Sequence, residues 1–266
     1  MAGDNCLISK PEDRRIVEKL TVSLSAPARQ ARPVGELAVA VGRFFLGSPY
    51  AAGTLERRGK ERLVVNLRQF DCFTLVENAV VLARLIRAGK KGFADYTAAL
   101  AEVRYRGGRL HGYASRLHYF SDWLRDNQEK RILKDVTRAL GGSPFSKSIN
   151  FMTANPRLYP PLKSPQVFRE MRAVEQRCSR RQLYHIPKRE LRGAEEGILN
   201  GDLIGITTDR EGLDVVHAGL AVRVKGRIHL LHASRATGRV VLAPETLVRY
   251  LAADRTRAGI IVGRMQ

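Results

Sequence analysis

The stretch from residue 66 to residue 89, a short polar lead-in followed by apolar residues with helical spacing, dominates the pattern of this chain. The helix is expected to begin at Asp71 or Cys72 and to end near Ala88-Gly89. Its apolar positions wrap most of the way round, which is typical of a helix buried at the centre of a domain. A narrow polar patch interrupts them near the start: Thr74, Glu77 and Asn78.

Weaker helical patterns lie on both sides of this central stretch. We expect further helices over six ranges: about 14–20, 35–46, 93–106, 114–127, 165–178 and 244–252. Residues 137–164 are rich in glycine and proline, so a loop-rich connection is predicted there. Two apolar patches in it, Ile149–Met152 and Leu158-Tyr159, are expected to anchor the loop to the core.

The last third of the chain changes to the alternating pattern of strands. After a short strand at 63–65, strands are predicted over five ranges: 201–208, 214–224, 227–234, 239–244 and 259–264. Helices that precede an antiparallel sheet favour the α+β class. We expect residues 1–34 to be an N-terminal extension and residues 35–266 to be a single domain, with a helical and loop insertion at about 90–198.

Cys72 is a candidate nucleophile because of its place at the start of the central helix. Asp71 is a good N-cap for the unpaired amides of the first turn. The aligned peptide dipoles at a helix N-terminus favour a thiolate, which is the reactive form of cysteine. The alternative at this stage is an ordinary small core cysteine.

Two histidines are predicted to share one face of a β-hairpin. Lys225-Gly226 is a signal for a two-residue turn, and this turn fixes which residues lie opposite each other. Side chains alternate between faces along a strand, so His217 and His232 fall on one face and His229 on the other. The same count predicts two further pairs: Gly219 with His232, and His217 with Ser234. A cysteine at a helix start and histidines on a neighbouring sheet form the Cys–His arrangement of a papain-like enzyme.

Charge and cysteine content narrow the classes of partner and cofactor. The chain has 46 Lys and Arg against 26 Asp and Glu, a net charge of +20, which points to an anionic partner such as an acidic polymer. The basic residues are scattered, so no nucleic-acid partner is predicted. A zinc site built from Cys72, His217 and His232 is conceivable by ligand type, but it has no close-spaced ligand pair outside the hairpin. No metal and no cofactor are therefore predicted.

Several short motifs resemble those of a known superfamily. GSPYAAG, DCFTLVE, GDLIGI, HAGLAV and HAS are similar, in this order, to the signature set of NlpC-type cell-wall cysteine peptidases. Longer segments resemble its N-acetylmuramoyl-L-alanine amidase-like branch: VNLRQFDCFTLVE, RYRGG, SRLHYFSDWL, NFM, GDLIGITT and GLDVVHAGLAV. The resemblance covers residues from about 40 to 264 and implies a papain-like α+β core with helical additions.

The resemblance also implies roles for individual residues. Cys72 would be the nucleophile, His217 the general base, and His232 the group that orients His217. Phe73-Thr74 stand where the superfamily usually has Ser-Gly, as the branch prefers. Five residues are expected beside the substrate: Tyr50, Asp71, Arg116, His118 and Tyr119. For the last three, a helix face that packs on the core is an equally good interpretation.

The implied activity is hydrolysis of an amide in peptidoglycan fragments, between the muramoyl or anhydro-muramoyl lactyl group and L-alanine. A γ-D-glutamyl–diaminopimelate endopeptidase and a non-catalytic module that binds an anionic polymer remain as alternatives. The family is usually exported, so the periplasm or cell envelope is expected. The first twenty residues have no apolar core of a signal peptide and no membrane span is visible, so the cytoplasm is the other expectation.

Overall fold

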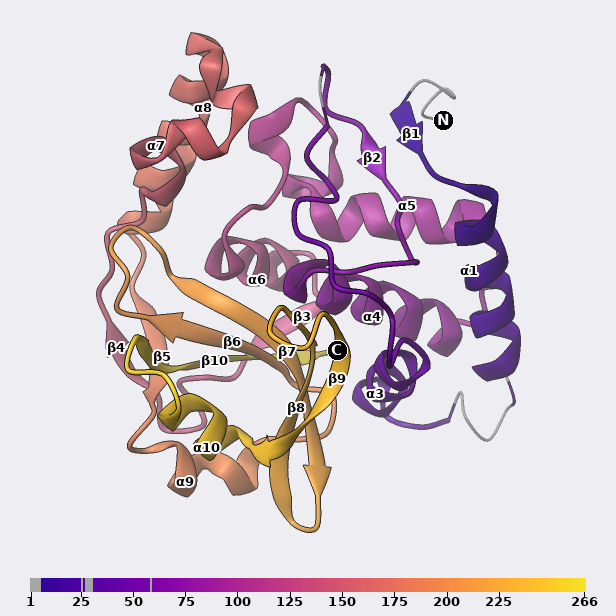
Figure 1. Ribbon diagram of the computed structural model, residues 1–266, viewed down its shortest axis with the longest axis vertical. Coiled ribbons are helices and arrows are strands. Elements are labelled where there is room, and N and C mark those ends of the chain that lie inside the picture. The colour runs from indigo at the N-terminus through magenta and orange to yellow at the C-terminus, as the bar shows by residue number, and fades with distance from the viewer. Residues whose placement is uncertain (1–5, 25, 27–30, 58) are drawn as a thin grey trace.

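The computed structural model describes residues 6–24, 26, 31–57 and 59–266. An eight-stranded sheet forms its centre, with the strands in the order β4-β5-β10-β6-β7-β8-β9 and with β3 paired to β10 (Figure 1). Its neighbouring strands are antiparallel. The strands are β3 (Leu133–Asp135), β4 (Ser143–Phe145), β5 (Leu183–Pro187), β6 (Leu203–Thr208), β7 (Val215–Val224), β8 (Arg227–Ser234), β9 (Arg239–Thr246) and β10 (Arg257–Met265). A separate parallel pair joins β1 (Leu7–Ile8) to β2 (Leu63–Val64).

Helices cover both faces of this sheet. Those before the sheet are α1 (Pro11–Leu24), α3 (Val34–Phe44), α4 (Cys72–Arg87), α5 (Phe93–Arg104) and α6 (Phe120–Glu129). Later in the chain come α7 (Phe151–Ala154), α8 (Pro165–Ser179), α9 (Leu191–Ala194) and α10 (Leu247–Ala252). Short 3₁₀ turns lie at Arg106–Gly108, Tyr113–Ser115, Pro156–Leu158, Pro160–Lys163 and Glu195–Gly197. Figure 1 shows α1, α3, α4 and α5 grouped together, with α7 and α8 at a separate end of the molecule.

The two faces of the sheet bury separate cores, and this separation positions the site. Leu220 and Leu231 point to the face on which α3 and α4 pack, in a core that also contains most of α4. Ala221 and Leu230, their neighbours along the strands, point to the opposite core. Leu247 and Leu251 fasten α10 to that opposite core.

A third and smaller core lies around α7, α8 and the turn at Tyr113–Ser115. It contains Tyr119, Met152 and Met171, and it also buries the thiol of Cys178. The resulting lobe lies within the predicted insertion of residues 90–198.

The α+β class and the predicted strands of the large sheet are confirmed, and three local predictions are wrong. The first helix is longer than 14–20, because α1 runs from Pro11 to Leu24. The helix predicted over 114–127 begins only at Phe120, because Arg116 forms a β-bridge with Tyr105. Leu158 is 64% exposed and is not part of a core, whereas its neighbour Tyr159 packs against the third core and Ile149 and Met152 are buried, as expected.

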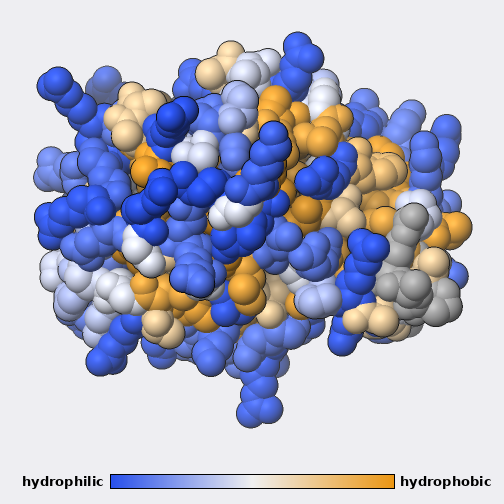
Figure 2. All heavy atoms as spheres, turned by 90° about the horizontal axis from the view of Figure 1, so that it is seen from below, coloured by the Kyte–Doolittle hydropathy of each residue, from blue (hydrophilic) through white to orange (hydrophobic). Residues whose placement is uncertain are grey.

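On the face shown in Figure 2, hydrophilic residues cover most of the area, and hydrophobic residues emerge between them. Within the described ranges, the helices are all too short or too polar to span a bilayer.

Candidate active site

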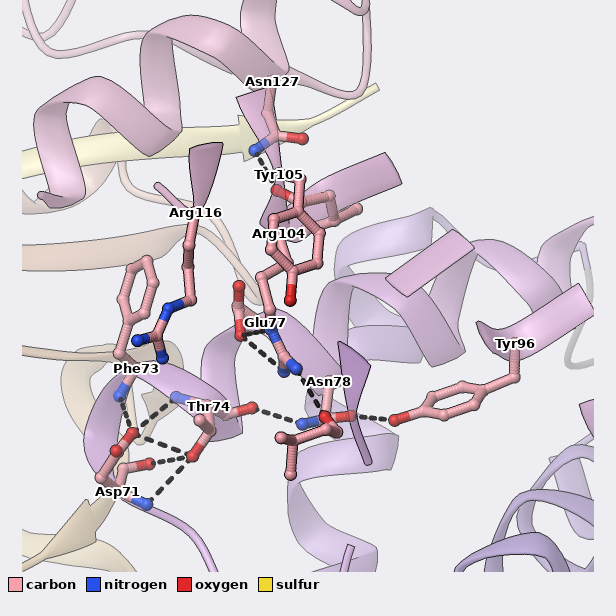
Figure 3. A network of polar contacts seen from close by, with 12 residues as sticks. Asp71, Phe73, Thr74, Glu77, Asn78, Tyr96, Arg104, Tyr105, Arg116 and Asn127 are labelled. Carbon is pink, nitrogen blue, oxygen red and sulfur yellow. Dashed lines mark hydrogen bonds and ion pairs between the residues drawn. The ribbon is translucent and has the colours of Figure 1, made fainter. Parts of the chain in front are cut away.

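The central helix begins at the predicted place and has a complete cap. Asp71 Oδ1 accepts hydrogen bonds from the backbone N–H groups of Phe73 and Thr74, at 3.1 and 2.8 Å. In return, the Thr74 hydroxyl oxygen accepts from the backbone N–H of Asp71, which completes a capping box (Figure 3). The carboxylate expected beside the substrate is therefore occupied in fixing the first turn, and it holds Cys72 at the first helical position.

The thiol of Cys72 meets the strand that carries His217. Cys72 is partly buried, and its sulfur accepts a hydrogen bond from the backbone N–H of Ala218 on β7. Burial, followed by the neighbouring charge of Asp71, raises the pKa of the Cys72 thiol to about 12. The helix dipole favours a thiolate, as the sequence suggested, but the loss of solvent outweighs it. The resting sulfur is thus a thiol.

The hairpin has the predicted two-residue turn, but its ladder stops earlier than the count implied. Pairing runs from Val224 opposite Arg227 to Leu220 opposite Leu231. The expected pairs Gly219–His232 and His217–Ser234 are not part of it. The backbone N–H of Ala221 donates to the carbonyl of Asp202, on the β6 side of the strand. Backbone N–H groups point alternately to the two neighbouring strands, so the N–H of Ala218 points toward β8. This N–H bonds to the Cys72 sulfur, at a position beyond the end of the β7–β8 ladder.

The two predicted catalytic imidazoles lie in direct contact. His217 Nε2 and His232 Nδ1 are 2.6 Å apart, with the rings perpendicular and their centroids 4.8 Å apart. Both side chains point to the face that α10 covers, and the body of α4 packs on the opposite face. The predicted shared face is therefore confirmed by this contact. Cys72, at the N-terminal end of α4, meets the backbone of β7 at Ala218, the residue next to His217.

Burial keeps both imidazoles uncharged. It lowers the pKa of His217 to about 3, with additional effects from the charges of His232 and Arg257. It lowers the pKa of His232 to about 4, again with a contribution from Arg257. The His217–His232 bond occupies Nε2 of His217 and leaves Nδ1 as its free ring nitrogen. If a neutral His217 is to accept a proton at Nδ1, its own proton must be on Nε2. From there it donates a hydrogen bond to Nδ1 of His232.

His229 is separated from this pair, as the alternation of side chains predicts. Its Nδ1 lies 2.9 Å from the carbonyl oxygen of Ala243 on β9. That contact falls where the β8–β9 register shifts between His229 and Leu231. His229 thus bonds to the backbone of a neighbouring strand.

Tyr50 borders the thiol, where the motif places it. The backbone N–H of Tyr50 donates to Gly238 at 2.8 Å, and that of Ala51 donates to Phe70 at 2.9 Å. The loop is thereby held between the turn after β8 and the residues just before Cys72. Burial, followed by electrostatic interaction with the neighbouring Cys72 and Asp71, raises the pKa of the Tyr50 hydroxyl.

The other three expected substrate residues have partners within the protein. Arg116 is 5% exposed and forms ion pairs with Glu56 at 2.7 Å and Glu61 at 3.3 Å. His118 Nε2 contacts the carbonyl of Tyr113 at 3.0 Å, and burial lowers its pKa. Tyr119 is 3% exposed and donates its hydroxyl proton to Glu175. These contacts account for all three as structural residues, and their contact with substrate stays a prediction.

The polar patch on α4, at Thr74, Glu77 and Asn78, forms a buried network next to the site. Glu77 and Arg104 form an ion pair at 2.9 Å with side chains 1% and 2% exposed, and Arg104 also donates to the carbonyl of Val64 (Figure 3). Asn78 donates to the carbonyl of Thr74 and accepts from the hydroxyl of Tyr96. This network fixes α4 against the segment that leads to Asp71.

The structure adds two residues to the site that the sequence did not suggest. The ring of Tyr250 on α10 lies over His217 and His232, with centroid distances of 6.1 and 5.3 Å. Arg257, on β10, lies over the face of this ring. Neither residue belongs to a recognised motif, and the helical spacing around Tyr250 gave no indication of its direction. In the described part of the chain, no group of three or more His, Cys, Asp or Glu is arranged to hold a metal ion.

Solved structures resemble this fold over most of its length. An N-acetylmuramoyl-L-alanine amidase from Bacteroides uniformis has a TM-score of 0.84 and 35% identity, covering 88% of this chain and 99% of that one. A Bacteroides fragilis protein named as a candidate xylanase has a TM-score of 0.80 and 38% identity, covering 85% and 100%. A Legionella pneumophila protein shares the fold at 20% identity and a TM-score of 0.69, covering 96% and 94%.

Comparison with protein families agrees with the solved structures, although no match was found among the curated proteins. The sequence profile described as N-acetylmuramoyl-L-alanine amidase-like matches residues 40–260, most of the chain. The chain therefore belongs to the N-acetylmuramoyl-L-alanine amidase-like family, the branch that its motifs indicated.

Proposed function

We propose that the protein is a cysteine-dependent amidase of the papain-like, NlpC-type superfamily, which hydrolyses the bond between N-acetylmuramoyl or anhydro-muramoyl groups and L-alanine in peptidoglycan fragments. One observation carries the proposal. The Cys72 sulfur takes the backbone N–H of Ala218, the residue next to His217, and His217 is bonded to His232 at 2.6 Å. A thiol, a neutral base and an orienting group thus meet at a helix start.

The nucleophile is generated during attack rather than beforehand. Because the pKa of Cys72 is raised and that of His217 is lowered, the resting pair is a thiol and a neutral imidazole. His217 Nδ1 takes the thiol proton as sulfur bonds to the amide carbonyl carbon. The imidazolium that forms keeps its Nε2 proton directed at His232 Nδ1, which stabilises the charge for the duration of the step.

The remaining steps return each group to its starting state. The backbone N–H of Cys72, which has no acceptor within the helix, can donate to the oxyanion. His217 then gives its proton to the leaving amine of L-alanine, and the carbon–nitrogen bond breaks to leave a thioester. A water molecule, deprotonated by His217, attacks the thioester and releases the lactyl carboxylate. The thiolate of Cys72 recovers its proton from the imidazolium.

The chemistry of these groups favours amide over glycoside hydrolysis. Glycosidases of the common types use two carboxylates that flank the scissile bond. The groups gathered at the start of α4 are a thiol and two imidazoles, and the nearest carboxylate, Asp71, caps the helix. We therefore do not extend the xylanase name of the Bacteroides fragilis relative to this chain.

Mass spectrometry of defined muropeptides after incubation with the protein tests the proposal. An amidase releases the sugar from the whole peptide, whereas a γ-D-glutamyl–diaminopimelate endopeptidase leaves the dipeptide L-Ala-D-Glu on the sugar. Cys72→Ala should abolish turnover with the fold retained, because it removes the sulfur that forms the proposed acyl-enzyme. The matched control is Cys6→Ala, which removes an exposed thiol. Residual turnover of Cys72→Ala within tenfold of the parent rejects the nucleophile assignment, and absence of any product from the parent favours a binding module.

The same proposal assigns the enzyme to the cell envelope, where its substrate is found. Cell fractionation followed by immunodetection tests that assignment, and recovery only in the cytoplasm rejects it.

A further inference from the structure

An aromatic ring covers the imidazole pair on the side away from α4. The ring of Tyr250 lies nearly parallel to that of His217, at 27° and 6.1 Å between centroids. It meets His232 edge to face, at 75° and 5.3 Å. Each of the three rings contacts the other two, so His217 cannot rotate toward α10 without displacing Tyr250.

Tyr250 is itself held in place by Arg257. The guanidinium carbon of Arg257 lies 4.1 Å from the centroid of the Tyr250 ring, a cation–π contact. Arg257 also donates to the backbone carbonyl of Tyr250 and forms an ion pair with Asp254 at 3.7 Å. One side chain therefore contacts both the ring and the backbone of Tyr250, while the buried Leu247 and Leu251 anchor the helix.

We propose that Tyr250, clamped by Arg257, is a positioning residue that holds the imidazoles of His217 and His232 in the orientation needed for proton transfer. This inference rests on the proposed function, since the transfer is that of the Cys72 proton. It gives α10 a task that no motif of the superfamily resemblance supplied.

Arg257 acts on the imidazoles in a second way. Its positive charge contributes, after burial, to the lowered pKa of both His217 and His232. The other groups facing His217 are His232 on β8 and Tyr250 on α10, and Cys72 on α4 lies beside the backbone of the next residue, Ala218. Since the first two are uncharged at neutral pH and Cys72 is a thiol, Arg257 is the charged group that acts on the pair. Removing its charge should raise the pKa of both imidazoles.

The first experiment removes the ring. Tyr250→Leu should lower kcat by roughly ten- to a hundredfold with little change in KM, because a misoriented base slows the chemical step rather than binding. Tyr250→Phe keeps the ring and should recover most of the loss. Tyr184→Leu is the matched control. Tyr184 lies on β5, away from the site, and its ring makes a similar cation–π contact with Arg138. Equal turnover of the Tyr250→Leu and Tyr184→Leu proteins overturns the proposal.

The second experiment needs no substrate. NMR titration of the imidazole C–H signals should give higher pKa values for His217 and His232 in Arg257→Gln than in the parent or in Arg257→Lys. If the parent hydrolyses muropeptides, the acid limb of its kcat/KM profile should move to higher pH in Arg257→Gln, because the base stays protonated longer. Arg249→Gln, an exposed cation on α10, is the control. Unchanged imidazole titration in folded Arg257→Gln overturns this part.

These two readouts separate the inference from the proposed function. If the parent does not hydrolyse muropeptides, the proposed function fails, but the titration still shows whether Arg257 acts on the imidazoles. If Arg257→Gln does not fold, Tyr250→Leu gives the test of orientation, since the imidazole signals should then broaden or shift while those of Tyr184→Leu do not.

Discussion

Replacing His232 with alanine removes the group that receives the Nε2 proton of His217 and leaves Cys72 and His217 in place. In the parent, the two ring nitrogens are 2.6 Å apart and His232 is 3% exposed, so water does not readily substitute for the lost partner. His217 then has no fixed tautomer, and its imidazolium has no acceptor.

The size of the loss follows from that one bond. A hydrogen bond to a charged group contributes about 1.5–3 kcal/mol, and each 1.36 kcal/mol in the barrier is tenfold in rate, so the bond alone gives roughly 10- to 150-fold. Losing control of the tautomer adds to this, and in triads of this type the loss reaches about 10²–10⁴. We therefore expect His232→Ala to lose at least about 10²-fold in kcat/KM on a defined muropeptide.

His229→Ala is the matched control, on the same strand and three residues away. Its imidazole contacts the carbonyl of Ala243 and not the pair, so turnover should stay close to that of the parent. Circular dichroism and thermal melts should accompany both variants, because both side chains are at least partly buried. An active, folded His232→Ala protein together with an inactive, folded His229→Ala protein would refute the reasoning from the hairpin.

Three further predictions concern protonation, metal and stability. Alkylation of Cys72 by iodoacetamide, followed by peptide mass mapping, should climb through the alkaline range toward pH 12 without the plateau near neutral pH that a resting ion pair would give. Treatment with EDTA should leave hydrolysis intact, and a loss that zinc reverses would instead support the zinc site. Glu77→Ala should lower the free energy of unfolding, measured with urea, by about 3–5 kcal/mol, because it leaves the buried Arg104 without its ion-pair partner. Glu129→Ala breaks an exposed ion pair and should lower it by less than about 0.5 kcal/mol.

Local patterns predicted those parts of the fold that depend on neighbours in sequence. The central helix begins at Cys72 because Asp71 and Thr74 form a cap within four residues. The two-residue turn at Lys225-Gly226 is equally local, since both residues adopt the positive φ that this turn requires. Such features need no knowledge of the tertiary fold.

Contacts between distant segments account for what the sequence did not predict. The ladder of β7 and β8 ends at Leu220 opposite Leu231, and beyond this point the backbone N–H of Ala218 on β7 bonds to the Cys72 sulfur of α4. Arg116, in the range where a helix was expected, forms a β-bridge with Tyr105 and ion pairs with Glu56 and Glu61, which lie some sixty residues earlier. In both cases a partner far along the chain overrides the local pattern.

The same contrast applies to the charge of the site. A net charge of +20 suggests that electrostatics dominate the protein, yet burial is the largest cause of the shifted pKa at Cys72, His217 and His232. Exposed charges act through water and are screened over about 10 Å, so the basic surface can attract an anionic polymer without altering the protonation of the buried pair. Arg257 differs because it lies against Tyr250, whose ring touches both imidazoles. On the proposed function, the scattered surface charge can therefore serve to attract an anionic substrate, while proton transfer would depend on the few buried contacts between α4, the hairpin and α10.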